Sequence, residues 1–193
     1  MSGNRNKTEL FSVIHRRQQF IADLLARMEE SAADELIRAI LGANRVFVSG
    51  KGRSGLVARC FAMRLMQMGF DAHVPGEATC PRIGAGDLMI AVSCSGTTMT
   101  TVTFARISRD SAARVVAVTA AEDSALAQNA DQLVLIPTSS ENVKSGYRYV
   151  IGPRNNTLFE ETLLLYFDAV VDAILESEDI PEAALQRRHT NLE

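Results

Sequence analysis

Asp87-Leu-Met-Ile-Ala-Val-Ser-Cys-Ser-Gly-Thr-Thr98 sets the fold class, because five consecutive apolar residues run directly into a turn rich in hydroxyl groups. An apolar run without alternation is typical of a strand buried on both faces of a parallel sheet. A helical pattern follows over 97–109, which places the turn between a strand and a helix. The stretch therefore predicts one strand-turn-helix unit of an α/β protein, with polar groups at its turn.

Similar units recur along the chain. Further β-rich runs cover 45–49, 71–75, 114–119 and 131–136, and helical patterns cover 54–68, 124–130 and 157–176, with a long irregular stretch at 137–156. Repeated units of this kind predict a three-layer α-β-α sandwich around a five-stranded parallel sheet with right-handed crossovers. We take the flavodoxin-like strand order 2-1-3-4-5 as a hypothesis, which would make the first and third strands neighbours.

Helices are also expected before and after this core in the sequence. Apolar residues recur at three- and four-residue steps over 8–30. A second N-terminal helix is expected to start at Ser31, with Asp34 as a variant of the capping box, and to stop at Gly42. A short helix from Pro181 and a polar tail are expected at the end of the chain.

The length of 193 residues suits one domain with a full hydrophobic core. We expect a single domain over 1–193, made of an N-terminal helical extension (1–44), an α/β core (45–176) and a C-terminal helix with its tail (177–193). The chain is 47% apolar, yet it has no apolar run of the roughly 20 residues that a membrane helix needs. Its polar start has no secretory pattern, so we expect a cytoplasmic protein that does not associate with membranes.

The cysteines and charges argue against three further classes: disulfide-rich, metal-cluster and nucleic-acid-binding proteins. Three cysteines without CxxC spacing suit reduced thiols, and they suggest neither a disulfide framework nor a metal cluster. The net charge is -3 and the basic residues are scattered, so we do not expect nucleic acid as a partner.

Two strand ends are expected to form the binding site, because ligands of open parallel sheets bind beyond the carboxyl ends of the strands where the strand order reverses. The first strand leads into Gly50-Lys-Gly-Arg-Ser-Gly55 and the third into Ser93-Cys-Ser-Gly-Thr-Thr98. Four hydroxyl groups beside the free amides of a helix N-terminus suit a phosphate monoester. Simple N-capping would need only one of them.

The first loop also fits the G-x-G-x-x-G pattern, which leaves a dinucleotide site as an alternative. That site would require an acidic residue at the carboxyl end of the second strand, about 20 residues after the glycines. Asp71 begins the strand and Glu77 lies further along than expected, so the pattern fits NAD poorly without excluding it. Tight-turn geometry explains the glycines equally well.

Glu160 is the candidate catalytic base. At about 100° per residue it shares a helix face with Leu164 and Phe167, whereas Glu161 lies on the solvated face. A carboxylate at the start of an apolar stripe is costly to bury unless it has a partner or a function. The alternative is a carboxylate favoured there by the helix dipole. His189, in the polar tail, would by itself be read as part of a frayed terminus.

These residues resemble the SIS (sugar isomerase) domain family, in which a S-x-S-G-x-T loop and a serine of the first loop hold a sugar phosphate. Further segments are similar to the 6-phospho-3-hexuloisomerases within that family: Arg64-Leu-Met-Gln-Met-Gly-Phe70, Gly76-Glu-Ala-Thr-Cys-Pro81, Thr157-Leu-Phe-Glu-Glu161 and Arg188-His-Thr-Asn-Leu-Glu193. The resemblance spans nearly the whole chain. The sequence departs from the family at Thr97, where many members have Glu, and at Gln67, where hexuloisomerases often have His.

The resemblance implies a role for each site residue. Phosphate contacts are implied for Ser54, Ser93, Ser95 and Thr98, and the two loops add Gly52, Arg53 and Cys94 to the substrate-binding set. Glu160 is implied as the catalytic base. His189 is implied to open or polarise the sugar, from its own or from a neighbouring subunit. No cofactor and no metal are expected.

The implied reaction interconverts D-arabino-hex-3-ulose 6-phosphate and fructose 6-phosphate through a cis-enediolate, in the ribulose monophosphate pathway of formaldehyde assimilation. The resemblance also implies a homo-oligomer, a tetramer or a dimer, and 3-hexulose-6-phosphate synthase as a pathway partner. Two alternatives stay open: another SIS isomerase that acts on a pentose or heptose phosphate, and a non-catalytic sugar-phosphate sensor.

Overall fold

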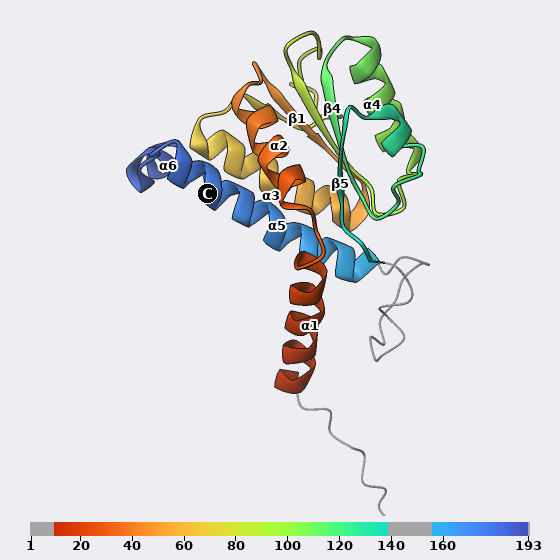
Figure 1. The fold of residues 1–193 in the computed structure, drawn as a ribbon. Coiled ribbons are helices and arrows are strands. Elements are labelled where there is room, and N and C mark those ends of the chain that lie inside the picture. The colour runs from red at the N-terminus through yellow and green to blue at the C-terminus, as the bar shows by residue number, and fades with distance from the viewer. Residues whose placement is uncertain (1–9, 139–155, 193) are drawn as a thin grey trace, which may run out of the picture.

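The computed structural model describes residues 10–138 and 156–192 around a central parallel sheet (Figure 1). The strands are β1 (Val46–Ser49), β2 (Ala72–His73), β3 (Leu88–Val92), β4 (Arg114–Thr119) and β5 (Gln132–Leu135). They run in the order β2-β1-β3-β4-β5, and each neighbouring pair is parallel. The predicted sheet and strand order are confirmed, and β1 and β3 lie side by side. The irregular stretch predicted over 137–156 falls almost entirely outside the described residues.

Helices cover both faces of the sheet, which confirms the three-layer sandwich. The helices α2 (Glu30–Leu41), α3 (Gly52–Met68) and α5 (Asn156–Ser177) form one layer, and α4 (Met99–Asp110) lies on the other face (Figure 1). Alternate strand residues serve the two layers, because successive side chains of a strand point to opposite faces. Val48 packs into the larger core beneath α3 and α5, whereas Phe47 packs into the smaller core beneath α4.

The N-terminal helices differ from the expected pattern. Instead of one helix over 8–30, α1 (Leu10–Leu25) ends at Leu25, and the chain turns before α2 begins at Glu30. Leu25 and Met28 both pack against the larger core, which requires the chain to bend between α1 and α2. The predicted cap at Ser31 is wrong, since Glu29 is the N-cap and makes no side-chain cap bond.

The helix predicted over 124–130 is also wrong, because only a single turn of 3-10 helix, η1 (Ala127–Asn129), forms there. Leu126 is fully buried in the smaller core, and its backbone N–H donates to the carbonyl of Gly96 at 2.9 Å. Ala130 is already extended toward β5. The contact of Leu126 with Gly96 and the extended backbone at Ala130 therefore limit the helix to this single turn.

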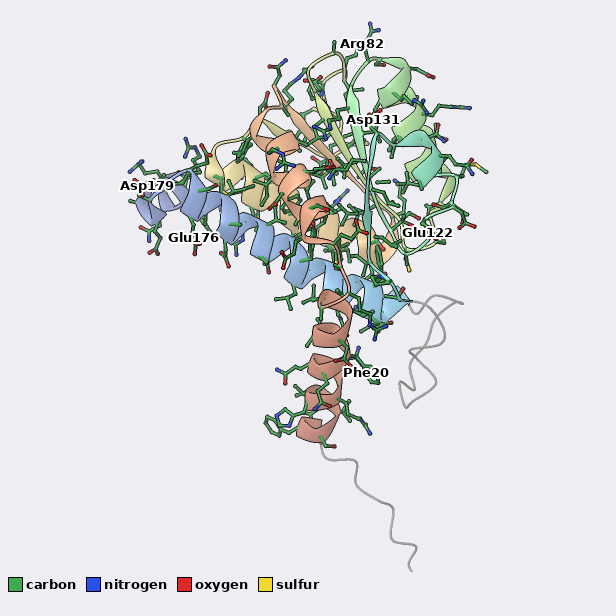
Figure 2. All side chains as sticks on the ribbon, in the orientation of Figure 1. Phe20, Arg82, Glu122, Asp131, Glu176 and Asp179 are labelled. Carbon is green, nitrogen blue, oxygen red and sulfur yellow. The ribbon has the colours of Figure 1, made fainter. Side chains whose placement is uncertain are left out.

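The two ends of the described chain lie outside the three layers. α1 projects from the body like an arm and contacts α5 near its base (Figure 1). Phe20, labelled in Figure 2, lies on this arm and packs against the small cluster of Leu24 and Leu158 that joins α1 to α5. α6 (Glu182–Arg188) packs against α3. None of the helices in the described part of the chain has the length and apolar character needed to cross a membrane.

Candidate active site

A pocket of about 250 Å³ opens at the carboxyl ends of β1 and β3, the two strands at the switch point of the sheet. The first turns of α3 and α5 and the turn that precedes α4 line it. Each helix N-terminus has free backbone N–H groups and the positive end of the helix dipole. The convergence of three such ends favours an anionic ligand.

The pocket brings together all of the residues predicted to bind the substrate. Gly52, Arg53 and Ser54 line it from the start of α3. The turn after β3 contributes Ser93, Cys94, Ser95 and Thr98. The predicted base, Glu160, lines the same pocket from the second turn of α5.

Hydroxyl groups of the turn after β3 bond to one another. The Oγ of Ser93 lies 2.9 Å from Oγ1 of Thr98, and the Oγ of Ser95 lies 2.9 Å from Oγ1 of Thr97. Thr98 is the N-cap of α4 but makes no side-chain cap bond. The Oγ atoms of Ser93 and Ser95 accept backbone N–H groups of the turn itself, from Gly96 at 3.1 Å and Thr97 at 3.3 Å. Capping of α4 therefore does not account for these hydroxyls, three of which line the pocket. Thr97 does not line it, which limits the predicted donor set to three from this turn.

Gly96 allows this turn to pack against the segment before β5. Its φ of +66° lies in the left-handed region, and an added Cβ would lie 2.0 Å from the Oγ of Ser124. The close approach explains why a glycine stands in the middle of the hydroxyl-rich turn.

Close backbone packing accounts for Gly50 and Gly55 of the first loop, and Gly52 has a left-handed φ of +59°. An added Cβ at Gly55 would lie 2.7 Å from the carbonyl oxygen of Gly50, so the start of α3 needs a glycine to approach the end of β1. Glu77, the acid further along from β2, does not line the pocket. Among the described residues, Glu160 is the acidic side chain that does.

Glu160 is buried beside a cation. Its side chain is 8% exposed, and Oε2 accepts a hydrogen bond from Nε of Arg53 at 2.5 Å, while the Oγ of Ser54 lies 3.4 Å from Oε1. A buried carboxylate needs such a partner to stay charged. The predicted stripe is partly wrong, since Phe167 is buried but Leu164 is 40% exposed. The start of α3 contacts the carboxylate of Glu160 through Arg53 and Ser54.

Glu161 has a different environment from the one predicted. Instead of facing solvent freely, its carboxylate is 26% exposed and accepts hydrogen bonds from Nε and Nη2 of Arg17 on α1. The adjacent acids of α5 therefore differ in role, because Glu160 lines the pocket and Glu161 links α5 to α1.

His189 is not brought to the pocket of its own chain. It follows α6, which packs against α3, and the Arg188 guanidinium lies 2.9 Å from where a Cβ at Gly69 would stand. Gly69 caps the far end of α3, whereas the pocket lies at Gly52. The 17 residues of α3 separate these ends by about 25 Å.

Two polar residues of the pocket were missed in the sequence, along with the apolar Val92. Lys51 stands in the glycine-rich loop, where its charge could have been read as part of an anion site. Thr157 is buried in the first turn of α5, three residues before Glu160, and this spacing places both on one helix face. A hydroxyl and a carboxylate three residues apart in a predicted helix could have indicated that both line the same site.

Comparisons with known proteins agree on one family. Residues 39–151 match the model of the SIS domain. A 3-hexulose-6-phosphate isomerase of Bacillus subtilis (strain 168) is 36% identical over 182 residues, covering 91% of this chain and 98% of that protein. A protein of the same name from Mycobacterium gastri is 38% identical over 173 residues, covering 90% and 86%. A crystal structure of a hypothetical protein from Methanococcus jannaschii, which infers a function of 3-hexulose-6-phosphate isomerase, has a TM-score of 0.78 at 30% identity and covers 96% of this chain and all of that one.

Proposed function

The chain belongs to the SIS domain family, and we propose that it is a 6-phospho-3-hexuloisomerase, which interconverts D-arabino-hex-3-ulose 6-phosphate and fructose 6-phosphate. One observation carries the proposal beyond the family. A buried carboxylate, Glu160, lines the same pocket as a turn of phosphate-type donors. An isomerase of this kind needs both parts, an anchor for the phosphate and a base for a carbon-bound proton.

The hydroxyl-rich turn binds the phosphate group in this proposal. Ser93, Ser95 and Thr98 donate hydroxyl hydrogen bonds, Ser54 donates from the start of α3, and the N-terminal amides of α4 face the same anion. The phosphate does not take part in the bond changes. Its binding energy positions C2 and C3 of the sugar beside the base.

Glu160 transfers the carbon-bound proton. Its carboxylate removes the proton from C2 of the 3-ulose, the C–H electron pair forms the C2=C3 double bond, and the carbonyl electrons move to O3. The hydroxyl proton then passes from O2 to O3, the carbonyl forms at C2, and Glu160 returns a proton to C3. One carboxylate serves both steps, and no electrons leave the sugar.

His189 acts in this scheme from a neighbouring subunit, because it lies near the end of α3 that is farthest from the pocket of its own chain. An imidazole can donate or accept a proton near neutral pH, which suits opening of the sugar ring. The proposal therefore includes a homo-oligomer, in which residues 1–193 form a single SIS domain whose N-terminal extension contributes to assembly.

The projecting arm supports assembly of several copies. Leu10 and Phe11 are 68% and 71% exposed at its tip, and Leu165, which lies one turn after Glu161, is 49% exposed. Helices in proteins are stabilised mainly by packing of an apolar face against another surface. A second copy of the chain is a partner that can cover the same apolar residues on both sides.

In the ribulose monophosphate pathway, the substrate of this reaction is supplied by 3-hexulose-6-phosphate synthase, which we propose as the pathway partner. The partnership requires only the shared intermediate, and it needs no contact between the two enzymes.

The function is tested by incubating the purified protein with ¹³C-labelled fructose 6-phosphate and recording ¹³C NMR spectra. The proposal predicts a new ketone carbon at C3, and no comparable conversion of a pentose 5-phosphate or a heptose 7-phosphate. Conversion of one of those sugars alone would identify another isomerase of the family. Binding of all of them without conversion would identify a sensor.

A further inference from the structure

The Arg53 side chain makes only part of its possible contacts. Its Nε donates to Glu160, and no hydrogen bond joins its two terminal nitrogens to any of the described residues. The side chain lines the pocket and is 61% exposed, whereas the carboxylate that it holds is 8% exposed. One edge of the guanidinium thus faces the base and the rest remains available to a ligand.

Guanidinium geometry determines what such a ligand would be. The group is planar, and its Nη1 and Nη2 groups together present two parallel N–H bonds at the edge that Nε does not occupy. This fork matches two neighbouring oxygens in one plane that share a negative charge. In a cis-enediolate, O2 and O3 are two such oxygens.

We propose that Arg53 bridges the base and the reacting sugar: Nε fixes the carboxylate of Glu160, and the Nη groups bind O2 and O3 of the enediolate. The assignment rests on the proposed function and adds the electrophile to it. In the first step the charge gathers on O3 as Glu160 takes the proton from C2. In the second step the charge passes to O2, the hydroxyl proton having moved to O3, before the carbonyl forms there. A fork that contacts both oxygens stabilises the charge throughout, without moving.

The other polar groups of the pocket are less suited to this role. The hydroxyls of Ser93, Ser95 and Thr98 belong to the turn before α4 and serve the phosphate, which is three carbons away from the reacting bond. Lys51 lines the pocket, but its ammonium is a point charge that cannot present two parallel donors. Arg53 is also the cation that has a hydrogen bond to Glu160 among the described residues.

The test compares Arg53→Ala and Arg53→Lys with a matched control. Arg59→Ala removes another arginine of α3, which is 60% exposed and lies 4.0 Å from Glu77, away from this pocket. Loss of one preorganised donor to a developing oxyanion lowers kcat about 10²- to 10³-fold. We expect Arg53→Ala to show a loss of that size with KM changed no more than about threefold, since the phosphate holds the substrate. Arg59→Ala should match the wild type.

Arg53→Lys and added guanidinium separate catalysis from structure. Arg53→Lys keeps the charge and, if Arg53→Ala fails to fold, carries the test alone, with a kcat at least about tenfold below wild type because the fork is missing. Millimolar guanidinium should restore part of the kcat of folded Arg53→Ala and leave Arg59→Ala unchanged, which a structural role would not produce.

The results distinguish the two proposals. If the wild type forms the 3-ulose but Arg53→Ala or Arg53→Lys keeps kcat within about threefold, the role of Arg53 is wrong and the isomerase stands. A rise in KM alone would likewise make Arg53 a binding residue and overturn the inference. A wild type that forms no 3-ulose overturns the proposed function itself.

Discussion

Ser95 is the exposed pocket hydroxyl of the turn after β3. Its Oγ lies 2.9 Å from Oγ1 of Thr97 and accepts the backbone N–H of Thr97 at 3.3 Å. A hydrogen bond to a charged group contributes about 1.5–3 kcal/mol, which corresponds to roughly 10- to 100-fold in affinity. We predict that Ser95→Ala raises KM by such a factor and lowers kcat much less, as steady-state kinetics would measure. Ser111→Ala, the same change at the far end of α4, should leave both constants unchanged. A fall in kcat at constant KM would place Ser95 in the chemistry instead.

Asp87 is a buried carboxylate at the opposite end of the sheet, where it links the residue before β1 to the loop before β3. It accepts hydrogen bonds from Nε and Nη2 of Arg45 at 3.0 and 2.7 Å and from the backbone N–H of Gly84 at 2.8 Å. Burial raises the pKa of Asp87, but these hydrogen bonds outweigh it and hold the pKa below its usual value.

The pH dependence of stability follows from the lowered pKa of Asp87. The carboxylate stabilises the fold fully above the pKa of an unfolded Asp, about 3.9, and this contribution is lost as the pH falls through the lower folded pKa. We predict that Asp87→Asn lowers Tm by roughly 3–8 °C at pH 7, and that the difference from wild type shrinks below about pH 4. Thermal unfolding followed by circular dichroism measures this, with the exposed Asp123→Asn as control. An equal difference at pH 3 and pH 7 would contradict the role of the charge.

Among the elements, the turn after β3 depends on the segment before β5 through Gly96. Gly96→Ala adds a methyl group 2.0 Å from the Oγ of Ser124 and imposes a left-handed φ on an L side chain, which alone costs about 1–2 kcal/mol. We predict a lower Tm and weaker phosphate binding, measured by thermal unfolding and isothermal titration calorimetry. Gly84→Ala, where an added Cβ meets nothing within 4 Å, should change neither quantity.

A second variant separates the clash from the backbone strain. Gly96→Ala combined with Ser124→Gly removes the overlapping side chain but keeps the unfavourable φ. Partial recovery of Tm is expected. No recovery would mean that the contact with Ser124 does not position the turn.

The elements also show how far the sequence could predict the structure. The strands were predictable because buried parallel strands are continuous apolar runs, as in Leu88–Val92. The helix over 124–130 was not, because its backbone is held by the carbonyl of Gly96, some 30 residues earlier in the chain. Glu160 stood out as a carboxylate near apolar residues. Its partner Arg53 was expected only to bind substrate, since the pairing of residues 107 positions apart depends on how α5 crosses α3.

At the scale of the whole molecule, a single copy of the chain leaves the apolar tip of the α1 arm exposed to solvent. We predict that wild-type protein is an oligomer in size-exclusion chromatography with light scattering, and that Leu10→Ser with Phe11→Ser shifts it toward the monomer. Burying one large apolar side chain contributes about 1.5–3 kcal/mol, so the two changes should weaken association strongly. Arg16→Ser, a polar change on the same arm, serves as control. A monomeric wild type would contradict both the interface and the proposed role of His189 across subunits.

The whole account depends on Glu160 as the group that moves a carbon-bound proton of a sugar phosphate. The most direct test incubates wild type and Glu160→Gln with fructose 6-phosphate in heavy water and follows the C3 proton by ¹H NMR. We expect the wild type to exchange this proton for deuterium, and the Gln variant, which keeps the shape of the side chain, to bind the sugar phosphate without exchange. Exchange by Glu160→Gln at a rate near that of wild type would contradict the assignment of the base.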